Sequence, residues 1–182
     1  MDQLIAFGIF SILIVWVSWR SIFSLKNHGF YRFMAWEGIL WLFVSNVFYW
    51  FINPFSWNQI IAWILLIAGG YLVLAGVITM KRKGQSSQSR TDDSLYAFEK
   101  TTKLIDTGIF RYIRHPLYSS LLFLCWGIFF KHPTWSLLLI GLVVSVMLFL
   151  TALHDEKECM VTFGDEYKSY MNRSKRFVPF LF

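Results

Sequence analysis

The chain has 182 residues, of which 56% are hydrophobic, 20% aromatic and only 15% charged. A soluble domain is about half apolar and about a quarter charged, and a single globule of this size could not bury so much apolar surface. The high apolar content excludes intrinsic disorder, and 11 glycines and two cysteines are too few for a collagen-like repeat or a disulfide scaffold. The composition therefore indicates an integral membrane protein.

Five apolar runs predict membrane helices, since a helix needs about 20 residues to cross a hydrocarbon layer of about 30 Å. They comprise residues 4–19, 33–52, 57–80, 117–130 and 134–153. The fourth run has only 14 residues, which leaves open whether it crosses the membrane or forms a helical hairpin with the fifth run around His132 and Pro133. We expect an all-α, polytopic membrane bundle of about five helices, with a short amphipathic C-terminal helix on the cytoplasmic side.

The distribution of basic residues predicts the orientation of this bundle. If the N-terminus lies outside, 16 of the 17 Lys and Arg residues fall on one side and Lys131 alone falls on the other, as the positive-inside rule requires. The loop 79–116 and the C-terminal tail are then cytoplasmic, together with any site that they form. Asp2 stands where a signal peptide would carry a basic residue, so no cleavable signal is expected.

The formal net charge of +6 needs no nucleic-acid partner. The basic residues flank the apolar runs, where they would meet anionic lipid headgroups. We therefore expect membrane lipids as partners and no nucleic acid, while the oligomeric state is not predicted. The small size and minimal loops favour a bacterial or archaeal cytoplasmic membrane.

The chain divides into three parts. Residues 1–80 hold three N-terminal membrane helices, and residues 81–98 form a polar linker whose Gly, Ser and Gln content is typical of a flexible segment. Residues 99–182 hold nearly all the polar chemistry. Beyond residue 153, apolar and aromatic residues keep a helical spacing that Gly164 interrupts, and such a segment would lie along the membrane surface or cap the bundle.

A first polar cluster, TGIFRYIRHPLYSS, comprises residues 107–120. Pro116 suits the first turn of a helix, where its missing N–H would have no partner anyway, and His115 then lies at the cap. Arg111 and Arg114 come just before it. Free N–H groups, the helix dipole and two guanidinium groups would make an anion site. The alternative is that the arginines anchor the helix to headgroups and the histidine only caps it.

A second cluster, HDEKE, follows directly on the fifth apolar run. Asp155 and Glu156 are adjacent carboxylates at the membrane edge, and they need a cation nearby. This cation could be Arg111 or Arg114 in a purely structural ion pair. It could equally be the ammonium group of a ligand, and the sequence leaves both possibilities open.

No metal site is expected. The side chains that could be imagined as ligands lack a compact ligand spacing; they are His115, His154 and Glu156. Cys125 lies in an apolar run and Cys159 beside charged residues, so neither indicates a thiolate site.

The two clusters together resemble a known superfamily. GIFRYIRHPLY resembles the G-P-Y-R-Y-x-R-H-P-x-Y signature of the isoprenylcysteine carboxyl methyltransferase and phospholipid methyltransferase superfamily. The tail DEKECMVTFGDEYKSYMNRSKRFVP resembles its E-E-x-x-L-x-x-x-F-G-x-E-Y-x-x-Y ending with the closing R-F-x-P. The resemblance covers residues 99–179, nearly half of the chain.

Some positions depart from the signature. Ile109 and Phe110 replace the usual Pro-Tyr, and Ser120 stands where Gly is common. Asp155 replaces the first Glu, and Cys159 replaces Leu. None of these changes introduces a charge where the superfamily has an apolar group.

The resemblance implies transfer of a methyl group from S-adenosylmethionine to a lipophilic acceptor that reaches the site from the bilayer. It assigns to the cofactor Thr102, Lys103, Leu104, Ile105, Phe110, His115, Pro116, Leu117, Tyr118 and Glu156. Glu156 and Arg114 are the predicted catalytic residues, with Glu156 acting as a ligand rather than as a base.

The chemistry of the cofactor agrees with this assignment. Its carboxylate suits the helix N-terminus at Pro116, and its ammonium group suits Glu156. An aromatic face such as that of Tyr118 would stabilise the sulfonium by about 0.5–2 kcal/mol. Because the methyl donor is already activated, the protein mainly aligns donor and acceptor, and no strong nucleophile is required.

The acceptor and two alternatives stay open. The prenylcysteine enzymes place an Arg about one turn before the acidic pair, but residues 151–153 contain no basic residue. A phospholipid amine or another small lipophilic acceptor is therefore as plausible as a prenylcysteine carboxylate. The tail, including Cys159, also resembles the ending of NADPH-dependent sterol-type reductases, and a non-catalytic membrane scaffold is the third hypothesis.

Overall fold

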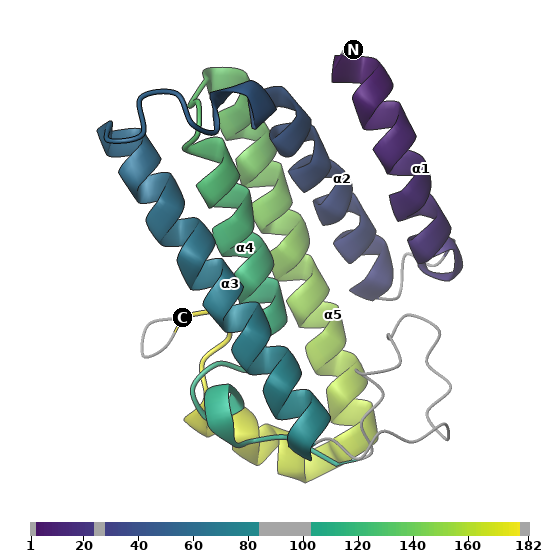
Figure 1. Cartoon of the computed structure of the whole chain (residues 1–182). Coiled ribbons are helices and arrows are strands. Elements are labelled where there is room, and N and C mark those ends of the chain that lie inside the picture. The colour runs from purple at the N-terminus through teal and green to yellow at the C-terminus, as the bar shows by residue number, and fades with distance from the viewer. Residues whose placement is uncertain (1–2, 24–27, 84–102, 179–182) are drawn as a thin grey trace.

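The computed structural model describes residues 3–23, 28–83 and 103–178, in which the chain is helical apart from turns and one isolated bridge (Figure 1). The elements are α1 (Gln3–Ile22), α2 (His28–Asn46), η1 (Val47–Tyr49), α3 (Trp57–Lys83), η2 (Gly108–Arg111), α4 (Pro116–Phe129) and α5 (Trp135–Arg173). The predicted all-α class is confirmed for this part of the chain. Of the predicted linker 81–98, residues 81–83 belong to the end of α3, and residues 84–98 lie outside the described residues.

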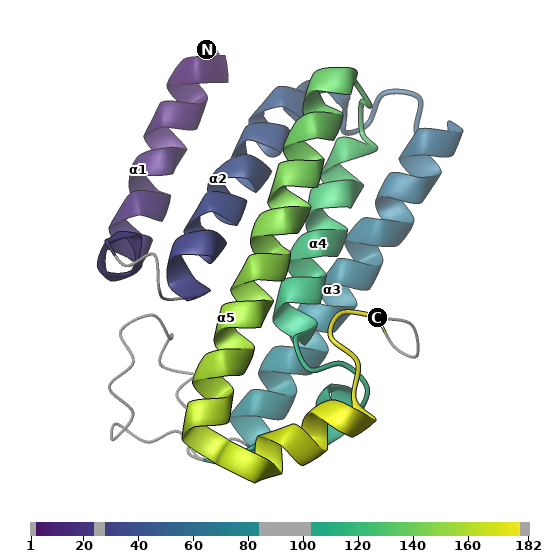
Figure 2. The ribbon, with the colours of Figure 1, turned by 180° about the vertical axis from the view of Figure 1, so that it is seen from behind.

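The long helices stand side by side in one bundle. Figures 1 and 2 show α4 beside α3 and α5, with α2 beside α5 and α1 at the outer edge. The most extensive contacts are those of α3 with α4, α2 with α5, and α1 with α2. The chain order is therefore not the spatial order, because α2 packs on α5 rather than on α3.

Small residues let these helices approach closely. A Cβ added to Gly127 of α4 would lie 2.9 Å from Cγ of Leu66 on α3 and 3.2 Å from its backbone nitrogen. Gly38 of α2 meets Val144 of α5 in the same way. Membrane helices commonly pack through small residues, because lipid supplies no hydrophobic drive for their association.

Helix α2 differs most from the predicted run 33–52. It begins five residues earlier, at His28, and ends at Asn46, after which the chain tightens into η1. The buried Asn46 side chain donates a hydrogen bond of 2.8 Å to the carbonyl of Ile128 on α4. At the other end, Nδ1 of His28 lies 2.7 Å from Glu158 of α5. Polar residues at both ends of α2 are thus held by other helices, which a search for apolar runs does not detect.

The fourth and fifth runs form two separate helices joined by a short turn that contains His132 and Pro133. Helices α4 and α5 lie side by side and antiparallel (Figures 1 and 2), joined by the turn 130–134. Thr134 caps α5, since its hydroxyl accepts a hydrogen bond of 3.3 Å from the Leu137 N–H.

Helix α5 continues far beyond the predicted apolar run and bends at Gly164. This glycine has φ 56° and ψ −129°, a backbone conformation that is essentially open only to glycine. Figure 2 shows that the segment after the bend lies across the end of the bundle. The predicted interruption at Gly164 is confirmed. Of the two places that the sequence left open for the tail, the structure shows it across the end of the bundle.

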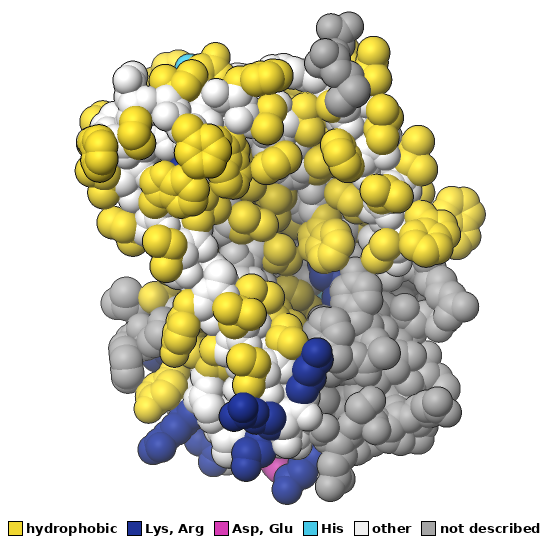
Figure 3. Space-filling view, viewed as in Figure 1, with side chains coloured by type: hydrophobic (Ala, Val, Ile, Leu, Met, Phe, Trp, Pro, Cys, Tyr) yellow, Lys and Arg dark blue, Asp and Glu magenta, His cyan; other side chains and the backbone are white. Residues whose placement is uncertain are grey.

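The surface agrees with a membrane environment. Helices α3 and α5 are long and apolar enough to cross a membrane, while the apolar stretches Gln3–Trp19 and Pro116–Phe129 are shorter. Large apolar side chains such as Trp16, Ile67 and Trp135 are exposed. Figure 3 shows hydrophobic side chains over most of one face and Lys and Arg gathered at its lower end.

Candidate active site

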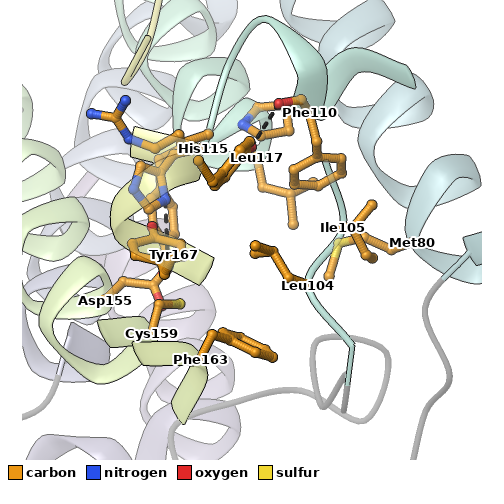
Figure 4. Close-up of a pocket in the computed structure, with 14 residues that line it drawn as sticks. Met80, Leu104, Ile105, Phe110, His115, Leu117, Asp155, Cys159, Phe163 and Tyr167 are labelled. Atoms are coloured by element: carbon orange, nitrogen blue, oxygen red, sulfur yellow. Dashed lines mark hydrogen bonds and ion pairs between the residues drawn. The ribbon is translucent and has the colours of Figure 1, made fainter. Parts of the chain in front are cut away.

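A pocket with about 720 Å³ of empty space, partly open to the surface, lies where the beginning of α4, the second half of α5, the end of α3 and the chain before η2 meet (Figure 4). Its lining residues are Met80, Leu104, Ile105, Phe110, Arg114, His115, Pro116, Leu117, Tyr118, Asp155, Cys159, Phe163, Tyr167 and Tyr170. Most of this lining is apolar or aromatic, and the charged groups gather at one side.

One wall is the N-terminus of α4. Pro116 occupies the first turn, and His115 is the cap residue, although its side chain makes no capping hydrogen bond. The next two residues, Leu117 and Tyr118, also line the pocket. Since the first N–H groups of a helix have no partner within the helix, this end of α4 offers donors and the positive end of the dipole to an anion.

The facing wall is a row of residues on α5. Asp155, Cys159 and Phe163 follow one another at intervals of four before the bend at Gly164, and they line the pocket together with Tyr167, which follows the bend. Residues four apart lie on the same face of a helix. In Figure 4, Asp155, Cys159 and Phe163 lie across the pocket from Met80 and Ile105.

The carboxylate that faces the pocket is that of Asp155. The Tyr118 hydroxyl donates a hydrogen bond of 3.1 Å to it, and Nδ1 of His115 lies 3.4 Å from it. The Cys159 thiol is 3.7 Å from its other oxygen. The side chain of Asp155 is 17% exposed, so it is held in place by three neighbours yet remains accessible.

The adjacent carboxylate, Glu156, lies behind the wall and does not line the pocket. Its side chain is 4% exposed. Nε of Arg114 lies 3.0 Å away, and Arg176 donates from Nε at 3.0 Å and from Nη2 at 2.8 Å. Of the two cations that the sequence suggested for the acidic pair, Arg114 is the one in contact, while Arg111 lies over the ring of Tyr112.

His115 joins the two acids. Its Nε2 lies 3.4 Å from Glu156, opposite the contact with Asp155. Burial alone would lower the pKa of His115, but the hydrogen bonds and charges of the two carboxylates outweigh burial and raise it above its ordinary value. The raised pKa favours the imidazolium form, in which both ring nitrogens carry a proton and each faces one of the two carboxylates.

The chain after α5 fastens this arrangement. The Arg114 N–H donates to the carbonyl of Lys175 at 2.7 Å, and the His115 N–H donates to that of Arg176 at 3.2 Å. The Ser119 hydroxyl donates to the carbonyl of Phe177 at 2.8 Å. We call residues 174–178 the strap. The strap positions the backbone that leads into α4, and it places the side chain of Arg176 beside Glu156.

The geometry brings the two polar clusters together around one pocket, and comparison with known proteins decides the family. The family model described as phospholipid methyltransferase matches residues 57–165, more than half of the chain. The chain belongs to the phospholipid methyltransferase family. The match contains α3, α4 and α5 as far as the bend, whereas α1, α2 and the strap lie outside it. Searches among curated proteins and solved structures gave no match.

Membership of this family supports a membrane methyltransferase in general. It favours this interpretation over the reductase alternative, which rested on the α5 motif alone. It also confirms the resemblance that the two motifs indicated.

Most of the predicted cofactor residues line the pocket. They are Leu104, Ile105, Phe110, His115, Pro116, Leu117 and Tyr118, and the predicted catalytic Arg114 joins them. Lys103 and Glu156 do not line it, and Thr102 lies outside the described residues.

Several lining residues were not predicted. Met80 comes from the end of α3, and Cys159, Phe163, Tyr167 and Tyr170 come from α5. The i, i+4 row that begins at Asp155 is the signal that could have found Cys159 and Phe163, which precede the bend at Gly164. Met80 carries no such signal, because its approach depends on how α3 packs.

One group of possible metal ligands occurs in the described part of the chain. Ligand atoms of His28, Asp155 and Glu158 lie within 4.8 Å of one another. His154 is elsewhere, since its ring packs on Tyr31 and its Nδ1 lies 2.9 Å from the carbonyl of Leu150.

Proposed function

We propose that the protein is an integral membrane methyltransferase that transfers a methyl group from S-adenosylmethionine to a lipophilic acceptor. The observation that carries this proposal is that both sequence motifs of the family, at His115–Tyr118 and from Asp155 onward, line the same pocket. The lining is mostly apolar and aromatic with a few polar groups gathered at one side, as is usual for a small-molecule or cofactor site.

The lining fits the charges of the cofactor. The N-terminus of α4 suits its carboxylate, and Asp155 suits its ammonium group because this carboxylate faces the pocket. The aromatic rings of Phe110, Tyr118 and Phe163 suit the sulfonium and the adenine. We therefore transfer the predicted role of ammonium ligand from Glu156 to Asp155.

Glu156 then acts as a positioning residue. It neutralises Arg114 and Arg176 and contacts His115, so it fixes the segment that forms the beginning of α4. Bound S-adenosylmethionine supplies an activated methyl group. The residues of the chain bind and orient it and exclude water, and no nucleophilic side chain is needed.

The lining also supports a lipophilic acceptor. Met80, Leu104 and Ile105 make the side of the pocket opposite α5 apolar. The guanidinium of Arg114 is bound to Glu156 and to the carbonyls of Met171 and Ser174, so it is poorly placed to hold an acceptor carboxylate. We propose a phospholipid amine or another small lipophilic molecule rather than a prenylcysteine carboxylate.

We propose further that all five helices cross or enter the bilayer, with the N-terminus outside and the pocket on the cytoplasmic side. The pocket lies at the end of the bundle where Lys and Arg gather in Figure 3, including Lys81, Arg82 and Lys83 in the last turn of α3. This distribution follows the positive-inside rule.

The test is calorimetric titration of detergent-purified protein with S-adenosylhomocysteine. We expect saturable binding that Asp155→Asn weakens by roughly 10- to 100-fold, because a hydrogen bond to a charged group contributes about 1.5–3 kcal/mol. The matched control is Asp165→Asn, whose carboxylate is almost fully exposed and bonded only to Lys168 among its described contacts.

The outcomes separate the hypotheses. Binding by the wild type and Asp165→Asn, with loss in Asp155→Asn, would support the proposal. Binding of NADPH in a parallel titration, without S-adenosylhomocysteine binding, would overturn it in favour of a reductase. Binding of neither by folded protein would favour a scaffold.

A further inference from the structure

One wall of the pocket is formed by a segment without regular secondary structure. Residues 103–107 precede η2 and are neither helix nor strand. Leu104 and Ile105 of this segment nevertheless line the pocket, on the side opposite α5 (Figure 4). Backbone of this kind lacks the hydrogen bonds of a helix or a sheet, so its position depends on the contacts that its side chains make with neighbouring elements.

This segment is tied to the end of α5 by an ion pair. Nη2 of Arg173, the last residue of α5, donates a hydrogen bond of 2.5 Å to Oδ2 of Asp106. Asp106 directly follows Ile105, so the contact acts on the backbone that carries the pocket-lining side chains. Within residues 103–107, all of which the structure describes, only Asp106 has a side chain that is hydrogen-bonded to another described element.

The short helix η2, which follows this segment, is held from two sides. The Tyr170 hydroxyl of α5 donates a hydrogen bond of 2.6 Å to the carbonyl of Phe110. Gly108 lies against the end of α3, where an added Cβ would approach Oγ1 of Thr79 to 2.9 Å. The ion pair extends this support to the stretch before η2, so that the end of α5 holds the wall at two points.

The cofactor proposed for the pocket has two chemically different halves. Its amino-acid half carries an ammonium group and a carboxylate, for which Asp155 and the N-terminus of α4 are the proposed partners. Its adenosine half is uncharged, and a flat aromatic group of this kind packs well on apolar and aromatic side chains. Leu104, Ile105 and Phe110 supply such a surface on the wall that the end of α5 holds.

We propose that Asp106 and Arg173 are positioning residues, whose ion pair holds the wall against which the adenosine half of the cofactor packs. Neither residue lines the pocket, so both act through Leu104 and Ile105. The inference rests on the proposed function, because it takes S-adenosylmethionine as the ligand of the pocket. It gives the end of α5, which lies beyond the segment 57–165 that matches the family model, a part in the site.

The test is the dissociation constant of S-adenosylhomocysteine for the wild type, Asp106→Asn, Arg173→Gln and the variant that combines both. The two side chains are 41% and 56% exposed, and an exposed ion pair contributes at most about a fivefold change in an equilibrium constant. We therefore expect each single substitution to weaken binding roughly two- to fivefold. The combined variant should bind no more weakly than either single variant, because substitutions at two residues that act through one shared contact are not additive.

A fragment of the cofactor separates the two sides of the pocket. 5′-Methylthioadenosine keeps the adenosine and the sulfur and lacks the amino-acid half. Asp106→Asn should weaken its binding by the same factor as that of S-adenosylhomocysteine, whereas Asp155→Asn should weaken the binding of S-adenosylhomocysteine alone. The midpoint of thermal unfolding should stay nearly unchanged in Asp106→Asn, because an exposed ion pair contributes little to global stability; a general loosening of the fold would lower it.

The matched control is Asp165→Asn. It breaks an ion pair with Lys168 that is also exposed and belongs to the same end of α5, and neither of these residues lines the pocket. We expect wild-type affinity for both ligands. Asp106→Asn and Arg173→Gln remove the same contact from opposite sides, so either carries the comparison if the other fails to fold, and failure of both to fold would contradict the local role of the ion pair.

The outcomes distinguish this inference from the proposed function. Absence of S-adenosylhomocysteine binding by the wild type would overturn the proposed function and the inference with it. Binding that is weakened in Asp155→Asn but equals that of the wild type in Asp106→Asn and Arg173→Gln would overturn the role of the ion pair alone. Additive losses in the combined variant, or failure of 5′-methylthioadenosine to bind the wild type, would do the same.

Discussion

The two ends of the helical bundle both bury charge, but they hold it in different ways. At the pocket end, Glu156 is enclosed by the guanidinium groups of Arg114 and Arg176. At the opposite end, Lys131 is only 2% exposed. Its ammonium group lies 3.0 Å from the side-chain oxygen of Gln59 and 3.6 Å from the ring centroid of Trp63. The pocket end pairs a buried carboxylate with cations, whereas the opposite end surrounds a buried cation with neutral groups.

The Lys131 end is a structural junction. The Gln59 amide donates to the carbonyl of Tyr49 at 2.7 Å and to that of Lys131 at 3.2 Å. The Asn58 amide donates to the carbonyl of Phe130 at 3.1 Å. These bonds tie the α4–α5 turn to α3 and η1.

The pocket end differs because one of its charges faces a cavity. Asp155 is held by Tyr118 and His115 and still lines the pocket. A buried charge is therefore not in itself the mark of a binding site. The mark is a charge that is fixed by its neighbours and directed at open space, next to the N-terminus of a helix.

Loss of Glu156 should have the largest effect on stability. Glu156→Gln leaves two guanidinium groups without their carboxylate, and breaking a buried ion pair in this way costs about 3–5 kcal/mol. We expect a large fall in the midpoint of thermal unfolding in detergent, followed by tryptophan fluorescence. Glu166→Gln, an exposed position on the same helix, is the control, and equal midpoints for the two variants would show that the cluster does not hold the site together.

A substitution at the bend in α5 should have the second largest effect on stability. Gly164→Ala puts a side chain on a backbone that favours glycine, at a cost of about 1–3 kcal/mol. Its partner variant is Gly70→Ala in α3, where an added Cβ would meet nothing within 4 Å and a small gain is expected. Unfolding midpoints measured side by side check this, and a stable Gly164→Ala protein that still binds the cofactor would show that the tail needs no bend.

Lys131 should affect stability without affecting the pocket. Lys131→Met keeps the length of the side chain and loses the cation–π contact, which contributes up to about 2 kcal/mol when desolvated. We expect a lower unfolding midpoint than for the exposed Lys157→Met, with unchanged affinity for S-adenosylhomocysteine. An altered affinity would mean that the two ends of the bundle are coupled.

A change of pH should have the smallest effect on the unfolding midpoint. Because the folded protein raises the pKa of His115, its contribution to stability is complete below the unfolded pKa and is lost as the pH rises through the higher folded value. The unfolding midpoint should therefore fall between neutral and alkaline pH, and less so in His115→Asn. A midpoint that rises over this range in the wild type, or an equal fall in the variant, would contradict the protonated state that we assign to His115.

The sequence predicts the helices better than the site. Apolar runs locate α1, α3, α4 and the first half of α5, and Gly164 marks the bend. The start of α2 could not be found in this way, because the segment before residue 33 is polar and is helical through its contact with Glu158, 130 positions along the chain. No local pattern reports a contact of that separation.

The motifs predict which segments meet but not which acid faces the pocket. Asp155 and Glu156 are neighbours, and successive residues of a helix point about 100° apart. Only the packing of α5 decides that Asp155 faces the cavity and Glu156 the strap. The spacing of Asp155, Cys159 and Phe163 indicates that they share one face of α5. Only the packing of the helix shows that this face lines the pocket.

The most direct test of the central claim follows the methyl group itself. Purified protein in phospholipid vesicles is incubated with S-adenosylmethionine labelled in its methyl group, and the label that becomes extractable into chloroform is counted for the wild type, Asp155→Asn and Asp165→Asn. The account predicts that the label accumulates in the lipid fraction with the wild type and Asp165→Asn and is lost with Asp155→Asn. A lipid fraction that gains label equally with all three proteins would contradict the assignment of the pocket to the methyl donor.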